Sequence, residues 1–291
     1  MSSVAMSRGS YARPIRWGKI TSTTIVYLLA IVSVLIALWP IFWIILTSIR
    51  PLHEITSTRL QILPQAPTLE NYVNVFTRYK TSTYLANSMI VSTGTVIFNL
   101  ILGAPAAYAM ARFSFRGERI LFGMIIIFRM IPMFAAMIPL FMIFSSVMLL
   151  DTLTSLIIAE TALKLPVTIW LLRNFFIDVP KELDESARVD GCSTWGGFFR
   201  IALPLIQPGL AAAAVLAFLW TWNDLIVTLI LSNTDKSTML PLGITKFLLE
   251  FGVDWGSLTA CGVLMFIPTV LFVFIAERYL VAGLTLGGVK E

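Results

Sequence analysis

The sequence has few of the residues that catalysis and metal binding require. Its 291 residues include one histidine and two cysteines, and only 13% are charged. The histidine, His53, has only Glu54 beside it, which favours a solvated loop side chain over a catalytic or metal-binding residue. Cys192 and Cys261 lie far apart in different kinds of segment, so we expect two free thiols. The sequence therefore predicts neither a catalytic centre nor a metal site.

Two further features limit the partners of the chain. The phosphate-binding sequence G-x-x-x-x-G-K-[ST] is absent, so a nucleotide would have to be bound by a separate protein. The net charge of +5 is modest, and the distribution of lysine and arginine explains it better than a nucleic-acid partner does. We therefore expect neither a bound cofactor in this chain nor binding to nucleic acid.

What the sequence has instead is apolar surface. Hydrophobic residues make up 57% of the chain and the mean hydropathy is +0.86, which excludes a water-exposed globule of this size. Apolar runs of the roughly 20 residues that a membrane helix needs lie at 21–49, 84–111, 120–144, 154–176, 205–231 and 258–280. The first run is too long for the core of a signal peptide, roughly 7–15 residues. We predict an all-α polytopic protein of the lipid bilayer, with about six transmembrane helices.

The apolar runs also define the organisation of the chain. We expect a cytoplasmic basic tail at 1–20, a first transmembrane helix at 21–49, an extracytoplasmic loop at 50–83, a five-helix core at 84–280 and a cytoplasmic tail at 281–291. The core contains a polar loop at 177–205. Lysine and arginine are commoner on the side of the N-terminus, and such enrichment marks cytoplasmic segments. Both termini and the polar loop are therefore predicted to be cytoplasmic.

The polar loop belongs to the longest charged passage between apolar runs, from Lys181 to Pro208, and its residues predict two short helices joined by a turn. Val179-Pro180 suits the start of the first helix, since proline is accepted in an opening turn. Acidic residues then lie where the helix dipole favours them, at Glu182, Asp184 and Glu185. Gly191 ends this helix, because glycine adopts the left-handed conformation without steric cost.

The second short helix has its own start signal, because Ser193 or Thr194 can cap it. The first short helix has acidic shoulders and one small-residue face around Ala187, which suits a groove in another protein. An ordinary solvated loop is the alternative interpretation of this passage.

The spacing of residues in the polar loop resembles a known motif. Glu185-Ser186-Ala187, Asp190-Gly191 and Ile201-x-Leu203-Pro204 resemble the EAA loop of permease subunits of bacterial ATP-binding-cassette (ABC) importers. Ser186 and Cys192 depart from the usual alanines, but both are small. Other segments are similar to the carbohydrate, MalG-like branch of this family: 70–72, 106–109, 112–117, 222–224 and 283–290. Together the similarities cover roughly residues 68 to 291.

The resemblance implies a type I ABC importer (MetI-like) permease fold and a set of partners. These are a second, MalF-like permease subunit, a homodimeric ATPase that holds ATP and magnesium, and an extracytoplasmic solute-binding protein, in a bacterial cytoplasmic (inner) membrane. The loop would be the coupling helix that contacts the ATPase, through Glu182, Glu185, Ser186, Ala187, Asp190, Gly191, Phe198, Leu203 and Pro204. The C-terminal tail would reach between the ATPase subunits through Gly287, Gly288 and Lys290, although a frayed terminus is an equal alternative.

Polar residues within the apolar runs are the candidates for a substrate pathway. Ser88, Ser92, Thr95, Asn99 and Gly103 share one helix face, which favours helix packing over a pathway. Arg129 is costly in a membrane and should be paired; we expect Glu160 as its partner, with hydrogen bonds to substrate hydroxyls as the alternative. The same alternatives apply to Asp224. The pathway candidates are Ser92, Asn99, Arg129, Glu160, Lys164, Trp222, Asn223 and Asp224.

These observations predict a transport subunit rather than an enzyme. We expect a permease subunit of an ATP-driven, binding-protein-dependent importer of a sugar or sugar-like solute, in which ATPase closure is coupled to alternating access. A permease for a phosphorylated or sulfonated sugar or a polyol is an alternative. An ion-coupled secondary transporter is a further one, which the absence of repeated spans argues against.

Overall fold

The computed structural model describes residues 17–57, 61–249 and 252–286, and these residues are almost entirely helical. Five long helices form the body: α1 (Trp17–Ser48), α4 (Thr81–Arg112), α7 (Leu153–Asp178), α11 (Gln207–Trp222) and α14 (Trp255–Leu286). Shorter helices connect them: α2 (Leu52–Ile55), α3 (Glu70–Thr77), α5 (Glu118–Phe128), α6 (Met133–Ser146), α8 (Lys181–Val189), α9 (Thr194–Gly197), α10 (Leu203–Leu205), α12 (Ile226–Leu231) and α13 (Leu240–Ile244). A π-helical turn η1 (Phe198–Ala202), a 3₁₀ turn η2 (Thr245–Phe247) and the antiparallel strands β1 (Leu248–Leu249) and β2 (Gly252–Val253) complete the described elements.

The long helices account for most of the expected membrane spans. Within the described residues, four helices are long and apolar enough to cross a bilayer: Ile25–Ser48, Thr81–Arg112, Leu153–Asp178 and Trp255–Phe274. Two bent pairs raise the number to six if each pair is one span. The pairs are α5 with α6, bent by 98°, and the segment Thr194–Leu205 with α11, bent by 77°.

Two of the expected spans are therefore not continuous helices. The run at 120–144 breaks between α5 and α6, where Pro132 is the N-cap of α6 and disfavours helical backbone at the residue before it. The run at 205–231 is divided after Trp222. There the Asp224 carboxylate accepts hydrogen bonds from the amides of Ile226 and Val227, at 2.9 and 3.1 Å, and so starts the separate helix α12.

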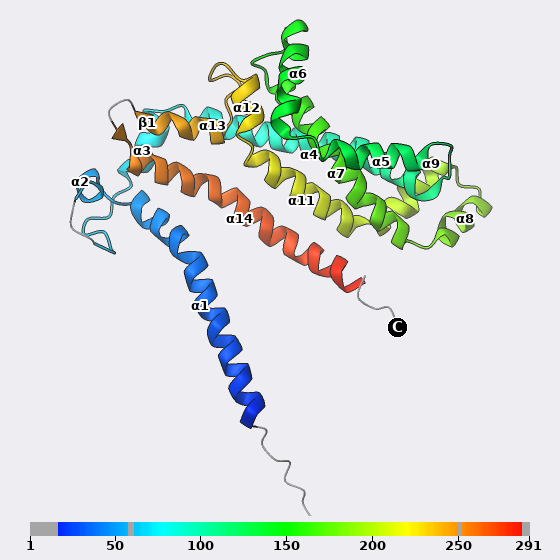
Figure 1. The fold of residues 1–291 in the computed structure, drawn as a ribbon, viewed down its shortest axis with the longest axis horizontal. Helices are drawn as coiled ribbons and strands as arrows, with labels where there is room; N and C mark the ends of the chain where they lie inside the picture. The colour runs from blue at the N-terminus through cyan, green and yellow to red at the C-terminus, as the bar shows by residue number, and fades with distance from the viewer. Residues whose placement is uncertain (1–16, 58–60, 250–251, 287–291) are drawn as a thin grey trace, which may run out of the picture.

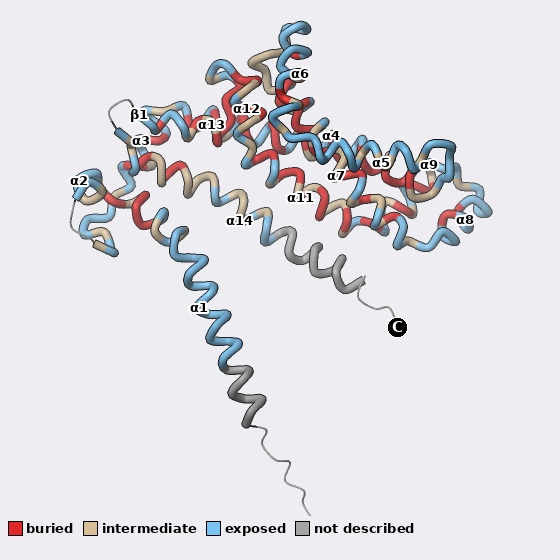
Figure 2. The backbone as a smooth tube through the Cα atoms, viewed as in Figure 1, coloured by how far each residue is buried: buried red, intermediate tan, exposed pale blue. Residues whose placement is uncertain are grey.

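The core of the molecule is the contact between α4 and α7, to which α11 is added. The predicted polar stripe of α4 lies here, and all its members are buried: Ser88, Ser92, Thr95, Asn99 and Gly103. Thr168 Oγ1 on α7 donates to Asn99 Oδ1 at 3.2 Å, and Thr168 Cγ2 would lie 2.8 Å from a Cβ at Gly103. The stripe thus serves helix packing, as the small residues predict. Figure 2 shows the buried backbone concentrated in these helices.

Helix α1 contributes little to this core. It contacts α14 near its C-terminal end and then diverges from the rest of the molecule (Figure 1). The residues from Ile25 to Trp39 are all exposed. Because these side chains are strongly apolar, this face requires lipid or another protein to cover it.

At the end of the molecule opposite α8, carboxylates hold the connecting loops together. Asp151, with φ +60°, accepts hydrogen bonds from Ser237 Oγ at 2.6 Å, Thr234 Oγ1 at 2.6 Å and the amides of Asn233 and Thr234 at 2.9 Å. Burial alone would raise the pKa of Asp151, but these hydrogen bonds outweigh it and lower the pKa to about 2. This carboxylate stays ionised at neutral pH and joins the α6–α7 turn to the loop after α12.

Close approach of α7 and α11 depends on Gly209, and this generates a stability prediction. A Cβ at Gly209 would lie 2.5 Å from Cγ of Phe175, whereas nothing lies within 4 Å of a Cβ at Gly123 on α5. We expect Gly209→Ala to destabilise the protein by about 1–3 kcal/mol through overpacking, measured as a lower apparent Tm of the detergent-purified chain. Gly123→Ala is the matched control and should leave Tm unchanged or higher. Equal Tm values for the two variants would contradict the assigned contact.

Candidate functional site

The polar loop folds as two short helices joined at Gly191, as the sequence predicts. Gly191 has φ +84°. Its amide donates to Arg188 O at 3.0 Å and the Cys192 amide donates to Ala187 O at 2.9 Å, which is the hydrogen-bond pattern of a Schellman motif. Ser193 Oγ then caps α9 by accepting from the Gly196 amide at 3.1 Å. The turn therefore has a single defined conformation that a side chain with a Cβ would strain.

A buried ion pair fastens α8 to the end of α4. Arg112 Nε lies 2.5 Å from Asp184 Oδ2, and both side chains are at most 10% exposed. Tyr108 OH donates to Asp184 Oδ1 at 3.1 Å, and Arg112 Nη2 donates to Val179 O at 2.9 Å. Sequence reasoning missed this contact, because it assigned Asp184 only to the helix dipole. The anchor joins the polar loop to a long helix through charge-assisted hydrogen bonds.

The anchor also decides which face of the loop is exposed. Ala187 lies three residues after Asp184 on the same helical face and is only 3% exposed. The expectation that the small-residue face around Ala187 is turned toward another protein is therefore wrong, because this face packs against the chain's own helices. Phe198 is likewise buried, in a cluster with Tyr108 and Phe176.

Other predicted loop residues lie on the outside. Leu203 is half-buried, and the exposed ones are Glu182, Glu185, Ser186, Asp190, Gly191 and Pro204. Four exposed apolar side chains that the sequence reasoning did not select accompany them: Leu183, Val189, Trp195 and Phe199. The sequence feature that could have identified them is their apolar character within a charged passage. The predicted tail residues Gly287, Gly288 and Lys290 lie outside the described residues.

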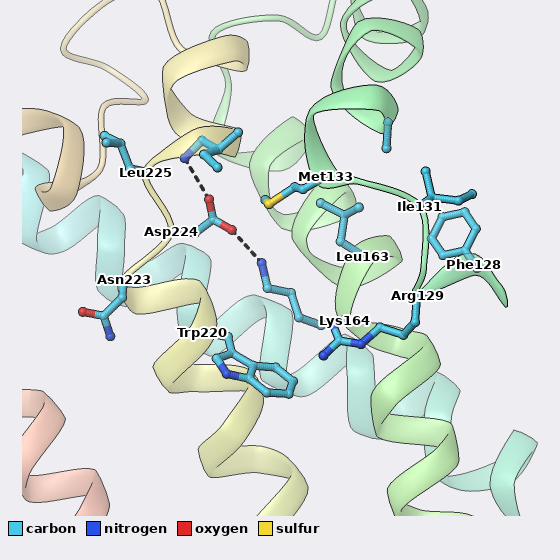
Figure 3. A pocket seen from close by; sticks show the side chains of 12 residues that line it. Phe128, Arg129, Ile131, Met133, Leu163, Lys164, Trp220, Asn223, Asp224 and Leu225 are labelled. Atoms are coloured by element: carbon cyan, nitrogen blue, oxygen red, sulfur yellow. Dashed lines mark hydrogen bonds and ion pairs between the residues drawn. The ribbon is translucent and has the colours of Figure 1, made fainter. Parts of the chain in front are cut away.

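A cleft of about 620 Å³ lies where the helices are interrupted. It is bounded by the break between α5 and α6, by α7 and by the end of α11 (Figure 3). Its lining is Phe128, Arg129, Ile131, Met133, Ala136, Leu163, Lys164, Trp220, Asn223, Asp224, Leu225 and Ile226. The cleft thus combines apolar walls with a few charged and amide groups, which is the usual composition of a small-molecule site.

The charged groups of the cleft form a network with the fully buried Glu160. Lys164 Nζ contacts Glu160 Oε2 and donates to Asp224 Oδ2 at 2.9 Å. Thr221 Oγ1 also donates to Glu160, at 3.3 Å. The predicted Arg129–Glu160 pair is wrong, because Lys164 lies one helical turn from Glu160 and occupies that position. Asp224 is therefore held from two sides, by Lys164 and by the first amides of α12.

Arg129 makes a different contact. Its guanidinium lies over the ring of Trp220, with 5.1 Å between Cζ and the ring centroid, a cation–π arrangement. Among the described residues it has no ion pair and no hydrogen bond from its side chain. Figure 3 shows Arg129 and Trp220 on the same side of the cleft as Lys164. Arg129 is consequently the cation of this site that remains without a carboxylate partner.

The other predicted pathway residues are divided between the cleft and the core. Asn223 and Asp224 line the cleft, but Trp222 is fully buried and donates from Nε1 to Met265 O at 3.0 Å. The sequence reasoning missed Trp220, which lies in the last turn of α11 and lines the cleft. Ser92 and Asn99 are buried on α4, where Asn99 accepts a hydrogen bond from Thr168 of α7, and neither lines the cleft. The described residues contain no group of three or more acids, histidines or cysteines that could hold a metal ion.

The buried network predicts an asymmetry between single and double substitutions. Lys164→Met leaves the Glu160 carboxylate without its cation in an apolar interior, which should cost about 3–5 kcal/mol. Lys164→Met with Glu160→Gln removes both charges and should restore much of this loss. The stability of the single and of the double variant is measured as the apparent Tm in detergent, followed by gel filtration. A double variant that is less stable than the Lys164→Met variant would contradict the assigned pairing.

Comparison with known proteins identifies one family. The family model described as "Binding-protein-dependent transport system inner membrane component" matches residues 99–286. The trehalose transport system permease protein SugB of Mycobacterium tuberculosis is 36% identical over 256 residues, which cover 87% of this chain and 93% of SugB. The arabinooligosaccharides permease AraQ of Halalkalibacterium halodurans is 34% identical over 258 residues, covering 88% and 92%. The sulfoquinovosyl glycerol permease SmoH of Agrobacterium fabrum is 32% identical over 253 residues, covering 87% and 89%.

Solved structures confirm the fold. A bacterial ABC transporter "involved in the import of the acidic polysaccharide alginate" contains a chain that superposes with a TM-score of 0.79 and 24% identity, covering 91% of this chain and 98% of the other. A chain of the MetNI methionine ABC transporter gives a TM-score of 0.57 and 18% identity, covering 68% and 94%. The expected all-α MetI-like permease fold is therefore confirmed, as is the resemblance to permeases of ABC importers.

Proposed function

Because the chain belongs to the family of inner membrane components of binding-protein-dependent transport systems, we propose that it is a permease subunit of an ATP-driven importer of a sugar or sugar-like solute. The relatives above are named for trehalose, arabinooligosaccharides and sulfoquinovosyl glycerol, all of which carry sugar units. The family, the helical fold, the cleft and the polar loop are all consistent with the role of a permease subunit. ATP hydrolysis belongs to a separate ATPase, so this subunit transports and is not an enzyme.

The cleft is the observation that carries the sugar assignment. Trp220 lines the cleft with an indole ring, and Asn223 and Asp224 line it with an amide and a carboxylate. An aromatic face suits the C–H surface of a sugar ring, while the amide and carboxylate can bond to hydroxyls. The volume of about 620 Å³ lies in the range of small-molecule pockets. Substrate would lie against the interrupted helices, where the second permease subunit closes the pathway.

The polar loop would couple transport to ATP. Its exposed apolar side chains, Leu183, Val189, Trp195 and Phe199, with the acidic groups beside them, suit a cleft on the ATPase. Closure of two ATPase subunits around ATP would move α8, and the Asp184–Arg112 ion pair would transmit that movement to α4. Substrate and ATP would then bias one conformational equilibrium between inward-open and outward-open states.

The proposal also assigns an orientation and a set of partners. The excess of lysine and arginine on the side of α8 favours a cytoplasmic position for the polar loop and both termini, in the cytoplasmic membrane of a bacterium. A second permease subunit, a homodimeric ATPase with ATP and magnesium, and an extracytoplasmic solute-binding protein complete the transporter. The binding protein would meet the opposite end, where Asp151 and Asp235 hold the loops.

One observation favours a second class of substrate. Arg129 lines the cleft without a carboxylate partner among the described residues, whereas Lys164 is neutralised by Glu160 and Asp224. A phosphorylated or sulfonated sugar or polyol would supply the missing anion. Sugar uptake by Arg129→Gln, tested with a neutral and an anionic sugar, separates this class from neutral sugars.

Uptake into proteoliposomes tests the transport mechanism. We expect the reconstituted complex, with its binding protein present, to accumulate a radiolabelled sugar only when ATP is available to the ATPase. Trp220→Ala should lower that uptake by about tenfold, because it removes one face of the cleft. Trp170→Ala, at an exposed tryptophan outside this cleft, is the control and should retain uptake. Accumulation driven by an ion gradient without ATP would reject the proposal in favour of a secondary transporter.

Gly191 provides a test of coupling itself. Gly191→Val denies the turn its positive φ, so the variant should hydrolyse ATP but lose most of its substrate-dependent stimulation and uptake. Gly117→Val is a matched control, because Gly117 also has a positive φ, of +91°, and open space around its Cβ. Gly117→Val should share any loss of stability but retain coupling. Normal uptake by the Gly191→Val complex would contradict the proposed role of the loop.

A further inference from the structure

A second cavity lies at the end of the molecule that carries α8, away from the substrate cleft. It has a volume of about 330 Å³ and lies where α4 ends, α5 and α8 begin and α7 approaches its last turns. Its lining is Met110, Ala111, Arg112, Phe113, Ser114, Glu118, Arg173, Ile177 and Lys181. We call this cavity the basic pocket, because three of these residues are cations and one is an acid.

Arg112 brings an unused donor to the basic pocket. Its side chain is only 4% exposed, yet Nη1 is buried without a hydrogen-bond partner in the described part of the chain. Nη2 donates to Val179 O, and Nε forms the ion pair with Asp184 without a hydrogen bond in the described residues. An unsatisfied donor on a buried cation is costly, so the wall that Arg112 forms retains hydrogen-bonding capacity that the described residues leave unused.

The other two cations are available to the same ligand. Arg173 is oriented by the ring of Phe122, 4.5 Å from Cζ, and by Met110 O, but its contact with Glu118 is long at 3.5 Å. Lys181 is exposed and makes no ion pair among the described residues. Arg112 is already balanced by Asp184, so Arg173 and Lys181 face a single carboxylate. The pocket therefore favours an anion, and Ser114 adds a hydroxyl donor.

The surroundings of the basic pocket identify the source of that anion. Phe113, Phe115, Leu121 and Ile177 are exposed apolar side chains. Phe113 and Ile177 line the pocket, and Phe115 and Leu121 lie within three residues of Glu118 in the chain. The helices that end here, α4 and α7, are two of the candidate membrane spans. A soluble anion would make no favourable contact with apolar side chains around its site. A phospholipid would, because its acyl chains lie beside its phosphate. Basic pockets at the ends of membrane helices commonly bind lipid head groups.

We propose that the basic pocket binds the phosphate of an anionic phospholipid, with Arg173 and Lys181 as its donors and with Arg112 as a further cation of its wall. This inference does not depend on the transported solute. Since Arg112 also anchors Asp184, lipid bound here would lie beside the ion pair that fastens α8 to α4, and it would stabilise that end of the molecule.

Lipid binding by the purified full-length chain tests the inference. The probes are dioleoylphosphatidylglycerol and dioleoylphosphatidylcholine, added to the detergent-solubilised protein and counted as bound lipids by native mass spectrometry. We expect preferential retention of phosphatidylglycerol. Arg173→Gln with Lys181→Gln should weaken that retention by about tenfold, and Lys181→Gln alone, at an exposed side chain, should weaken it less.

A charge-matched variant serves as the control. Arg116→Gln with Arg119→Gln removes two cations from the adjacent segment, outside the pocket lining, and should leave phosphatidylglycerol binding unchanged. Equal losses in both double variants would overturn the proposal, because they would reflect net charge alone. Equal retention of the two lipids by the unsubstituted chain would also overturn it. Displacement of phosphatidylglycerol by millimolar inorganic phosphate would assign the pocket to a soluble anion instead.

Discussion

The burial of one carboxylate determines how the polar end of this molecule is built. Asp184 is only 8% exposed, and because a buried charge without partners is strongly disfavoured, its carboxylate depends on the contacts with Arg112 and Tyr108. The partners come from the last turns of α4. A short helix that would otherwise fray at the surface is thereby held against a helix that spans the apolar body. The exposed face of α8, the buried side of Ala187 and the basic pocket next to Arg112 all follow from this contact.

A second constraint shapes the apolar body. Glu160 and Lys164 on α7 form ion pairs with each other and, through Lys164, with Asp224 in the break between α11 and α12. Asp224 also starts α12 through its carboxylate, so the end of α11 is fixed by an interaction that reaches α7. Together with the break at Pro132, this leaves backbone irregular in the middle of the bundle. Such irregularity is tolerated in a membrane only where protein or a water-filled cavity covers it, and the cleft lies there.

Sequence reasoning succeeded where the physics is local. The positive φ of Gly191 and the cap at Ser193 depend on residues within a few positions of one another, and the structure confirms both. It failed where long-range geometry chooses among several chemically suitable partners. Lys164 rather than Arg129 pairs with Glu160, and Trp220 rather than Trp222 faces the cleft. The burial of Ala187 could be predicted only from the contact between Asp184 and Arg112, which lies 72 positions earlier in the chain.

The central claim is that α8 and α4 move as one body when the ATPase closes. Spin labels at Val189 on α8 and Leu102 on α4, both exposed, report this directly in a chain whose Cys192 and Cys261 are replaced. The distance between the labels should be the same in the assembled transporter with and without ATP. Asp184→Asn should broaden the distribution of that distance. A distance between the two labels that changes on ATP binding would mean that α8 moves independently of α4, and the coupling proposed here would be wrong.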